Sequence, residues 1–469
     1  MISDFVQGMT DWLNAFASGA TTYDISFVHG NEYLFLAISL GIFVVLFLIF
    51  ESAWMFWRNR RFEESFKSIL LEIKVPREII KSPRAMEQVL FAMHSLRNAP
   101  SILSEQWIDG EITRWYSLEI ASFGGEVHFY VRTPFKQRNL VEAAFLGYYP
   151  DVELVEVDDY ATAVFPRTLQ DVYAQGYDVY GAELKLAKPD PFPLRSYKEF
   201  ETADEAQLFD PVTNLVEAFG KIKREEMMGM QIMFYPLHPK AREKWQPLVE
   251  EMRAMKGKKS DAKLSTSFPG GPLPHLEVKK SEEDEFGKLS RAWLRTPGET
   301  ESLKKLEENL GKPAFKAVLR FIYFSPKSLF YDSFPRRAVP GAMNQYADIG
   351  SNYFALNAMA GTRTGLEYRP YIFPKAREKY RKQHFLHRYQ ERDMPPHQWI
   401  GYILTSTPFF WNTHSVPFFI TTESLATIFH LPTTPVMTAP HVKRVESKKG
   451  GPPAGLPIFG DEEKLKKFM

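Results

Sequence analysis

The feature that most constrains this chain is a run of eighteen uncharged and almost wholly apolar residues, Tyr33 to Phe50. At about 1.5 Å per residue, a helix over this run extends about 27 Å, close to the hydrocarbon thickness of a bilayer. Trp54 and Trp57 follow, at the level where tryptophan favours the headgroup region. The run therefore predicts a transmembrane helix over residues 33–57 rather than the core helix of a soluble protein.

The distribution of basic residues predicts the orientation of that helix. The first 57 residues contain no Lys or Arg, and Arg58, Arg60 and Arg61 follow at once. Cytoplasmic flanks collect Lys and Arg, so we expect residues 1–32 to form a short extracytoplasmic tail. The tail lacks the basic start and the small-residue cleavage site of a secretory signal peptide. We predict a single-pass protein of the cytoplasmic (inner) membrane, with the lipid bilayer as a partner and its body in the cytoplasm.

The composition excludes several classes of chemistry. The chain has no Cys, which excludes disulfides, thiolate zinc sites, thiol catalysis and iron–sulfur clusters. Its formal net charge is +1, so no global field selects nucleic acid or a charged surface. About four hundred residues follow the apolar run, enough for two or three domains.

Residues 66–160 predict a first α+β domain with the element order β-α-β-β-α-β, the ferredoxin-like unit. Ser82-Pro83 is typical of a helix start, and Gly124-Gly125 of a hairpin turn. On the first hairpin strand, apolar Leu118 and Ile120 alternate with Ser117 and Glu119, which is typical of a half-buried strand.

A second α+β domain is predicted over residues 180–373. Apolar residues alternate with Glu183 and Lys185, and a later strand over 315–324 carries FIYFSP, which is similar to HFYVRTP at the end of the first hairpin. This likeness predicts a duplicated ferredoxin-like unit with a helical and linker insertion over 238–312. An independent α/β domain over 180–373 is the alternative.

The last part of the chain is predicted as a basic helix plus a strand–helix segment over 374–440, followed by a Pro/Gly/Lys-rich tail over 441–469. The helix over 374–392 carries a local excess of basic residues and also His384 and His387. It is a candidate surface for DNA or another acidic partner, and the alternative is an ordinary exposed helix. The candidate binding residues are Lys375, Arg377, Lys379, Arg381, Lys382 and Arg388.

Two stretches carry a family resemblance. LEIKVPREIIKSPRAMEQVL opens the first domain, and PFFITTESLATIFHLPTTPV runs from Pro417 and is followed by KKGGPPAGLPI. Together with the apolar run, these resemble the membrane-anchored N-terminal region of type IV secretion and conjugative-transfer ATPases, HerA-like or coupling-protein-like, of candidate-phyla bacteria. In that family the proline-rich linker leads into a RecA-like motor. The resemblance implies a RecA-like ATPase or other secretion-machine subunits as partners, and it supplies no catalytic residues.

The nucleotide-binding signature of such a motor is missing. A phosphate-binding loop needs GxxxxGK[ST], because backbone amides and the Lys surround the phosphates. Gly-Lys pairs start at 220, 257, 287 and 311, and none is followed by Ser or Thr. The motifs HExxH, GxSxG and GxGxxG are also missing. We therefore predict no cofactor, no metal site and no enzymatic activity, with the ATPase on a separate chain or this region standing alone.

The predicted function is that of a membrane-anchored scaffold that docks or organises the parts of a secretion or conjugation machine. Homo-oligomers are expected because ferredoxin-like units associate through open sheet edges. Two alternatives remain: a membrane-bound enzyme with a site between the α/β units, and a membrane tether that binds nucleic acid through the 374–392 helix.

Overall fold

The structure is a computed structural model, and it describes residues 10, 32–75, 82–200, 210–254, 297–348, 350–364, 372–396, 398–407 and 414–432. The chain divides into two compact units. The helix unit comprises Met1–Ser65, Ser101–Ile112 and Pro396–Trp411, and the sheet unit comprises Phe66–Pro100, Thr113–Pro395 and Asn412–Met469. The tail predicted over residues 1–32 lies outside the described residues except for Thr10 and Glu32, as do the predicted tail over 441–469 and most of the predicted insertion linker.

The helix unit is dominated by α2 (Glu32–Glu64), which includes the predicted apolar run. Within it, Leu36–Glu64 is long and apolar enough to cross a membrane, with a mean hydropathy of 2.4 in its most apolar window and few buried side chains. The described part of the unit also contains a π-helical turn, η2 (Glu105–Asp109), and a short helix, α13 (Trp399–Leu404). The position of the long apolar helix predicted from the sequence is thus confirmed.

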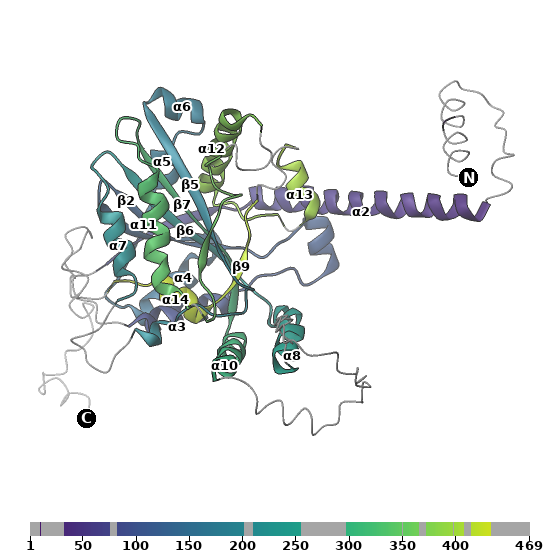
Figure 1. Cartoon of the computed structure of the whole chain (residues 1–469), viewed down its shortest axis with the longest axis horizontal. Coiled ribbons are helices and arrows are strands. Elements are labelled where there is room, and N and C mark those ends of the chain that lie inside the picture. The colour runs from purple at the N-terminus through teal and green to yellow at the C-terminus, as the bar shows by residue number, and fades with distance from the viewer. Residues whose placement is uncertain are drawn as a thin grey trace, which may run out of the picture. The chain divides into compact units, whose positions relative to one another are not determined.

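The sheet unit contains one sheet, to which the described residues contribute nine strands, with every paired neighbour antiparallel (Figure 1). The order is β4-β1-β3-β2-β6-β7-β5-β8, and β9 pairs with β7. The strands are β1 (Ser68–Lys74), β2 (Tyr116–Phe123), β3 (Glu126–Pro134), β4 (Glu153–Val157), β5 (Tyr177–Leu186), β6 (Met227–Pro236), β7 (Ala314–Pro326), β8 (Phe354–Asn357) and β9 (Phe418–Thr421).

Both predicted α+β domains contribute to this one sheet. The strands β4, β1, β3 and β2 come from residues 68–157, and β6, β7, β5 and β8 come from residues 177–357. The two sets meet where β2 pairs with β6, with Tyr116 opposite Phe234 at one end and Phe123 opposite Met227 at the other. The α+β fold class is therefore confirmed, with an antiparallel sheet that is continuous across the two predicted domains.

The first hairpin turns where the sequence predicted it. Gly124 and Gly125 connect β2 to β3 with φ of 61° and 93°, a region that favours glycine because it has no Cβ. A Cβ at Gly124 would also lie 2.7 Å from the carbonyl oxygen of Arg224. Both the turn and the close backbone contact require glycine at this position.

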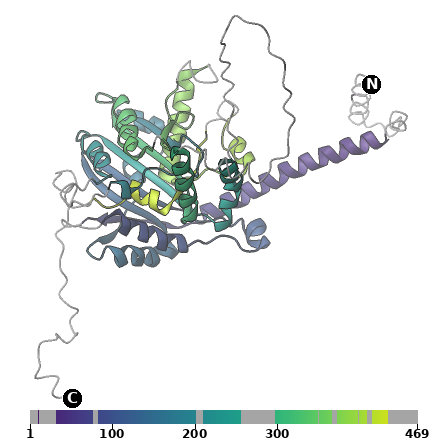
Figure 2. The same cartoon turned by 60° about the horizontal axis from the view of Figure 1, so that its bottom comes forward.

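Helices cover both faces of the sheet (Figure 2). One apolar core joins inward-facing strand residues to α3, α4, α7, α11 and α14, and a second core on the opposite face involves α5, α6 and α12. The bounds are α3 (Pro83–Ser95), α4 (Arg138–Tyr148), α5 (Tyr160–Val164), α6 (Leu169–Ala174), α7 (Thr213–Gly220), α11 (Ser333–Met343), α12 (Pro374–Glu391) and α14 (Thr422–Ile428).

The start of α3 lies where Ser82-Pro83 predicts it, and a side-chain cap also marks the start of α14. The Ser82 side chain accepts a hydrogen bond from the Arg84 amide, with Pro83 in the first turn of α3. The Thr421 side chain likewise accepts from Ser424 at the start of α14. These caps fix where each helix begins.

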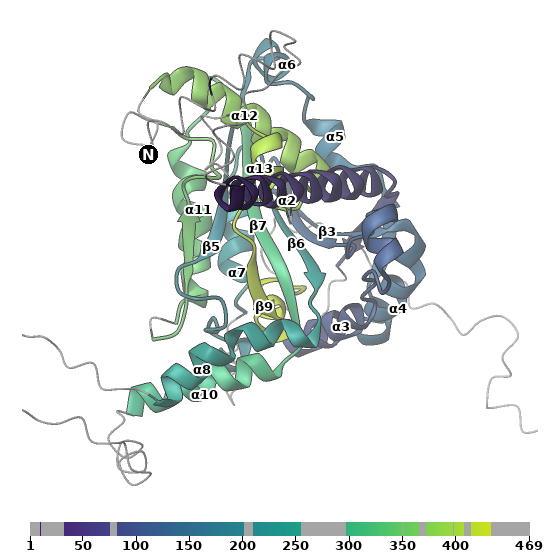
Figure 3. The ribbon, with the colours of Figure 1, turned by 90° about the vertical axis from the view of Figure 1, so that its right-hand side faces the viewer.

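The described part of the predicted insertion contains a 3-10 segment, η6 (Pro239–Trp245), and two helices, α8 (Gln246–Ala254) and α10 (Pro297–Gly311). The two helices lie side by side (Figure 3) and share a small apolar cluster of Val249, Leu303 and Leu306. The helix predicted over 239–256 therefore begins with a 3-10 segment, which has Pro239 in its first turn.

Candidate functional site

Four polar residues lie opposite one another across the middle of the sheet. Glu119 on β2 is paired in register with Gln231 on β6, and Gln231 with Arg320 on β7. Arg320 is in turn paired with Glu183 on β5. We call these four residues the polar row. Each is at most 1% exposed, which is unusual because a buried charge is costly unless it is paired and hydrogen-bonded.

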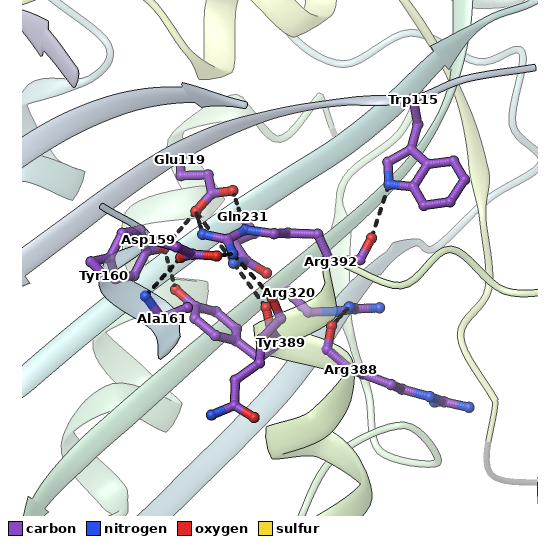
Figure 4. Close-up of polar contacts among 11 residues, drawn as sticks. Trp115, Glu119, Asp159, Tyr160, Ala161, Gln231, Arg320, Arg388, Tyr389 and Arg392 are labelled. Carbon is purple, nitrogen blue, oxygen red and sulfur yellow. Dashed lines mark hydrogen bonds and ion pairs between the residues drawn. The ribbon is translucent and has the colours of Figure 1, made fainter. Parts of the chain in front are cut away.

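The polar row caps the C-terminal end of α12 (Figure 4). Arg320 donates to the carbonyl oxygens of Arg388 at 2.6 Å and Asp393 at 3.0 Å, and its guanidinium lies 3.1 Å from Glu183. Gln231 donates to the carbonyl oxygen of Tyr389 at 3.1 Å. The last carbonyls of a helix have no partner within it and carry partial negative charge. The sheet thus supplies the donors that this buried helix end needs.

Arg392 is the residue at which α12 ends, and its side chain forms an ion pair with Glu119 of the polar row. Its backbone is left-handed, with φ of 52°, at a position where glycine is the usual residue. Its fully buried guanidinium donates to the two oxygens of Glu119 at 2.8 and 3.1 Å and pairs with Asp159. The indole of Trp115 donates to its carbonyl oxygen at 3.0 Å. These contacts hold Arg392 in a conformation that a non-glycine residue rarely adopts.

Two tyrosines complete the network. The Tyr160 hydroxyl donates to Glu119 at 2.6 Å, and it lies 2.9 Å from the hydroxyl of Tyr389. Tyr389 approaches the sheet where β6 has Gly229, and a Cβ at that glycine would lie 2.0 Å from the Tyr389 hydroxyl. One turn earlier on α12, Phe385 packs over Gly181 of β5 in the same way. Glycine is required at both strand positions because the helix side chains fill the space of a Cβ.

The electrostatics of the network favour fixed charges. Burial alone would raise the pKa of the Glu119 carboxyl, but the charge and hydrogen bonds of Arg392 outweigh it and hold that pKa below its ordinary value. Burial opposes the charge of Arg392, yet Glu119 keeps its pKa well above the usual range. Burial raises the pKa values of Tyr160 and Tyr389. Near neutral pH, Glu119 and Arg392 therefore form an ion pair beside two neutral phenols.

This arrangement is structural. Its charged groups bind one another and the helix carbonyls, and Glu119, Arg320 and Arg392 are each 0% exposed. A general acid or base must reach a substrate proton directly or through one water. No group of His, Asp or Glu with the arrangement of a metal site occurs among the residues that the structure describes. The network fixes α12 on the sheet.

The basic helix predicted over 374–392 is present as α12, but its predicted exposure is wrong for most of the candidate residues. Arg377, Arg381, Lys382 and Arg388 are buried, whereas Lys375 and Lys379 are exposed. The reason is the long aliphatic side chains of Arg and Lys, which pack on the sheet unit while their charged ends find partners. The proposal that this helix binds DNA or a partner stays a prediction.

The partners of two buried cations show how this works. Lys382 lies 2.7 Å from a carboxylate oxygen of Asp178 and 3.0 Å from Glu378. Arg381 donates to the carbonyl oxygens of Ala358, Gly361 and Arg363 at 3.2–3.4 Å. His384 is half-buried, and burial lowers its pKa to about 3, whereas His387 is exposed. The two histidines therefore lie in different environments.

In the helix unit, the residues predicted to mark the membrane boundary lie along the C-terminal half of α2. Trp54 and Trp57 are 37% and 46% exposed. The Trp54 indole donates to the carbonyl oxygen of Trp107 at 2.9 Å. The guanidinium groups of Arg58 and Arg61 lie over the Trp57 ring at 5.7 and 4.8 Å from its centroid, and Arg60 lies 3.1 Å from Glu63.

Sequence reasoning missed the polar row. Glu119 and Glu183 lie on strand faces that the alternation predicted to be exposed, and β2 is buried along nearly its whole length. The signal in the sequence is the pair of strand glycines, Gly181 and Gly229, because glycine within a strand marks the close approach of another element.

Comparison with known proteins identifies the family. Residues 61–351 match the family described as a domain of unknown function, DUF8128, and since this is more than half of the chain, the chain belongs to it. No curated protein matches the chain.

Proposed function

We propose that this protein is a membrane-anchored scaffold of a type IV secretion or conjugative-transfer machine, which holds a RecA-like ATPase at the cytoplasmic membrane. The observation that carries the proposal is α2, an apolar helix followed by Arg58, Arg60 and Arg61. Basic residues at one end of a span favour the cytoplasmic side. The N-terminus is then outside, and the sheet unit is cytoplasmic.

The burial of the polar row supports a docking role over an enzymatic one. The ionisable groups of the row and Arg392 are buried and cap a helix end, so they do not line an accessible site. Enzymes more often place such groups in a cleft that admits substrate. The strand–helix segment that carries the family resemblance, β9 and α14, is also buried in the core.

We also propose that the sheet is built from two ferredoxin-like units. The first has the element order β1-α3-β2-β3-α4-β4 and the strand order β4-β1-β3-β2. The second follows the same scheme with β5-α7-β6-β7-α11-β8 and the strand order β8-β5-β7-β6. This repeat supports the duplication that the likeness of the two strand motifs predicted.

Cysteine accessibility in intact cells tests the topology cleanly, because the chain has no Cys of its own. Thr10→Cys in the tail should react with a membrane-impermeant maleimide, and Lys375→Cys on α12 should react only after lysis. Wild-type protein is the unlabelled control. Labelling of Lys375→Cys in intact cells would place the body outside and refute the proposal.

Photo-crosslinking tests the partner. A photoreactive amino acid at exposed positions such as Lys375 or Tyr331 should capture an ATPase that carries GxxxxGK[ST], identified by mass spectrometry. The same residue at buried Phe145 is the matched control and should capture no partner. Crosslinks to other proteins only, with the ATPase expressed, would contradict the scaffold role.

A further inference from the structure

Two segments far from α2 in the sequence join it in the helix unit. Asn59 of α2 is 6% exposed and links both segments. With its amide oriented to satisfy both ends, it donates to the carbonyl oxygen of Gly110 at 3.0 Å and accepts from Gln398 at 2.8 Å. Ser101–Ile112 and Pro396–Trp411 are thus joined at one level of α2.

Close backbone contacts show that both segments are packed on the helix. At Gly110, which has φ of 69°, a Cβ would lie 2.5 Å from the carbonyl carbon of Arg58. At Gly401, a Cβ would lie 2.9 Å from the ring of Phe56. These glycines allow η2 and α13 to pack against α2 more closely than side chains would permit.

The position of these contacts along α2 corresponds to the membrane boundary. Trp54, Phe56, Arg58 and Asn59 follow the end of the apolar run at Phe50 by four to nine residues. At about 1.5 Å per residue this is roughly 6–14 Å beyond the hydrocarbon core. The headgroup region adds about 5–8 Å to each side of the core. Trp54 therefore lies within it, and Phe56, Arg58 and Asn59 lie at and beyond its aqueous edge.

Both segments present apolar side chains outward at this level. Ile102, Leu103 and Ile108 lie in or beside η2, and Trp399 and Leu404 lie in α13. Their side chains are between 54% and 74% exposed. Each short segment thus exposes two or three apolar side chains, and exposed apolar surface beside an apolar helix is typical of an interaction site. The η2 segment adjoins α2 through the contact of Trp54 with Trp107, and α13 adjoins it at Gly401 and Phe56. The helix α2 is apolar enough to enter a membrane.

We propose that η2 and α13 form an interfacial anchor that inserts these five apolar side chains into the headgroup region of the cytoplasmic leaflet. The inference rests on the proposed membrane placement of α2. Apolar residues and tryptophan carry the contact, as in amphipathic segments that lie in the plane of an interface. The acidic residues Glu105 and Asp109 within η2 argue against a purely electrostatic attraction to anionic lipid.

Site-specific fluorescence in liposomes tests the anchor. The full chain, reconstituted in phosphatidylcholine–phosphatidylglycerol vesicles, carries a single Cys labelled with the environment-sensitive dye NBD. We expect dye at Ile108→Cys and at Leu404→Cys to emit at shorter wavelength. It should also be quenched more strongly by a lipid nitroxide near the headgroup than by one deep in the acyl chain. High salt should leave both effects unchanged.

Two further positions separate the possible failures. Dye at Val45→Cys, in the middle of α2, should be quenched by the deep nitroxide, which tests the membrane placement itself. Dye at Lys304→Cys, whose side chain is 76% exposed in the sheet unit, is the aqueous control. If Val45→Cys is quenched while Ile108→Cys and Leu404→Cys behave like Lys304→Cys, the interfacial anchor is refuted and α2 remains a span. A blue-shifted dye that no lipid nitroxide quenches means that the position is buried against protein, in the same chain or in a second copy, and it also overturns the anchor.

Discussion

The substitution Arg392→Met tests whether the buried ion pair fixes α12. It removes the donors to Glu119 at 2.8 and 3.1 Å, the pair with Asp159 and a hydrogen bond to the carbonyl oxygen of Gln390 at 3.0 Å. Glu119 then keeps its neutral partners, among them Tyr160 at 2.6 Å and Gln231 at 3.3 Å, but has no cation. Removing one member of a buried pair costs about 3–5 kcal/mol, because the other charge stays buried without compensation.

The substitution Glu119→Gln, combined with Arg392→Met, measures the coupling energy between Glu119 and Arg392. Glu119→Gln leaves Arg392 paired with Asp159, whose side chain is 33% exposed, so we expect a smaller loss of about 1–3 kcal/mol. The double variant should cost less than the sum of the single ones by about 2 kcal/mol, since no unpaired carboxylate remains. Arg138→Met is the matched control: its side chain is 34% exposed and pairs at the surface with Glu142, so its loss should stay below about 1 kcal/mol.

The contribution of Glu119 to the free energy of unfolding depends on pH with opposite signs in the wild type and in Arg392→Met. In the wild type the pKa of Glu119 is below its value in the unfolded chain. Its stabilising contribution is therefore present above that unfolded pKa and is lost as pH falls. In Arg392→Met, burial without a cation raises the pKa of Glu119, so the native variant takes up a proton more readily than the unfolded chain. The difference in the free energy of unfolding between the wild type and Arg392→Met should therefore become smaller as pH falls from 8 to 5.

Urea unfolding of the full chain in nonionic detergent micelles measures these differences. Tryptophan fluorescence is a suitable signal, because Trp115 donates to the carbonyl oxygen of Arg392. A loss below about 1 kcal/mol that does not change with pH would refute the reasoning, since it would mean that water reaches the pair.

Three further predictions concern the same face of the sheet. Gly229→Ala and Gly181→Ala should each cost about 2–4 kcal/mol in urea unfolding, because the new Cβ would overlap Tyr389 or Phe385, whereas Gly147→Ala in α4, with open space around it, should be neutral or stabilising by up to about 1 kcal/mol. The pKa of His384 is lowered to about 3, so the unfolded chain binds its proton first and stability falls as pH drops below about 6.5; His384→Phe should remove about 2 kcal/mol of that fall at pH 5, and His387→Phe should not. Arg377→Gln/Arg381→Gln/Arg388→Gln should lower the unfolding temperature, whereas Lys375→Gln/Lys379→Gln should not, which makes the lysine pair the proper variant for salt-dependent DNA binding; equal unfolding temperatures would contradict the observed burial.

Local features of this fold could be predicted from the sequence. The apolar run, the Ser82 cap and the Gly124-Gly125 turn each depend on residues close together in the chain, and all three lie where they were expected. The strand alternation also located β2 and β5. Backbone conformation near such residues follows from sterics and local hydrogen bonds.

The polar row could not be predicted, because its environment is set by distant parts of the chain. Glu119 and Arg392 are 273 positions apart, and a strand with alternating polar residues predicts a solvated face unless another element covers it. Here α12 covers it. The same helix looked exposed in the sequence because the nineteen residues over 374–392 include seven basic ones: Lys375, Arg377, Lys379, Arg381, Lys382, Arg388 and Arg392. Their burial depends on acceptors that local patterns do not reveal.

The pairing of β2 with β6 has a consequence for how this protein can be divided. If the chain were cut between the two halves, β2 or β6 would become an edge strand of eight or more residues in each fragment. The unpaired backbone amide and carbonyl groups of such an edge can pair with other chains. The outermost strands of the intact sheet, β4 and β8, have only five and four residues. In the intact protein the pairing of β2 with β6 covers the edges of both strands. Half-length fragments should precipitate or form dimers through them.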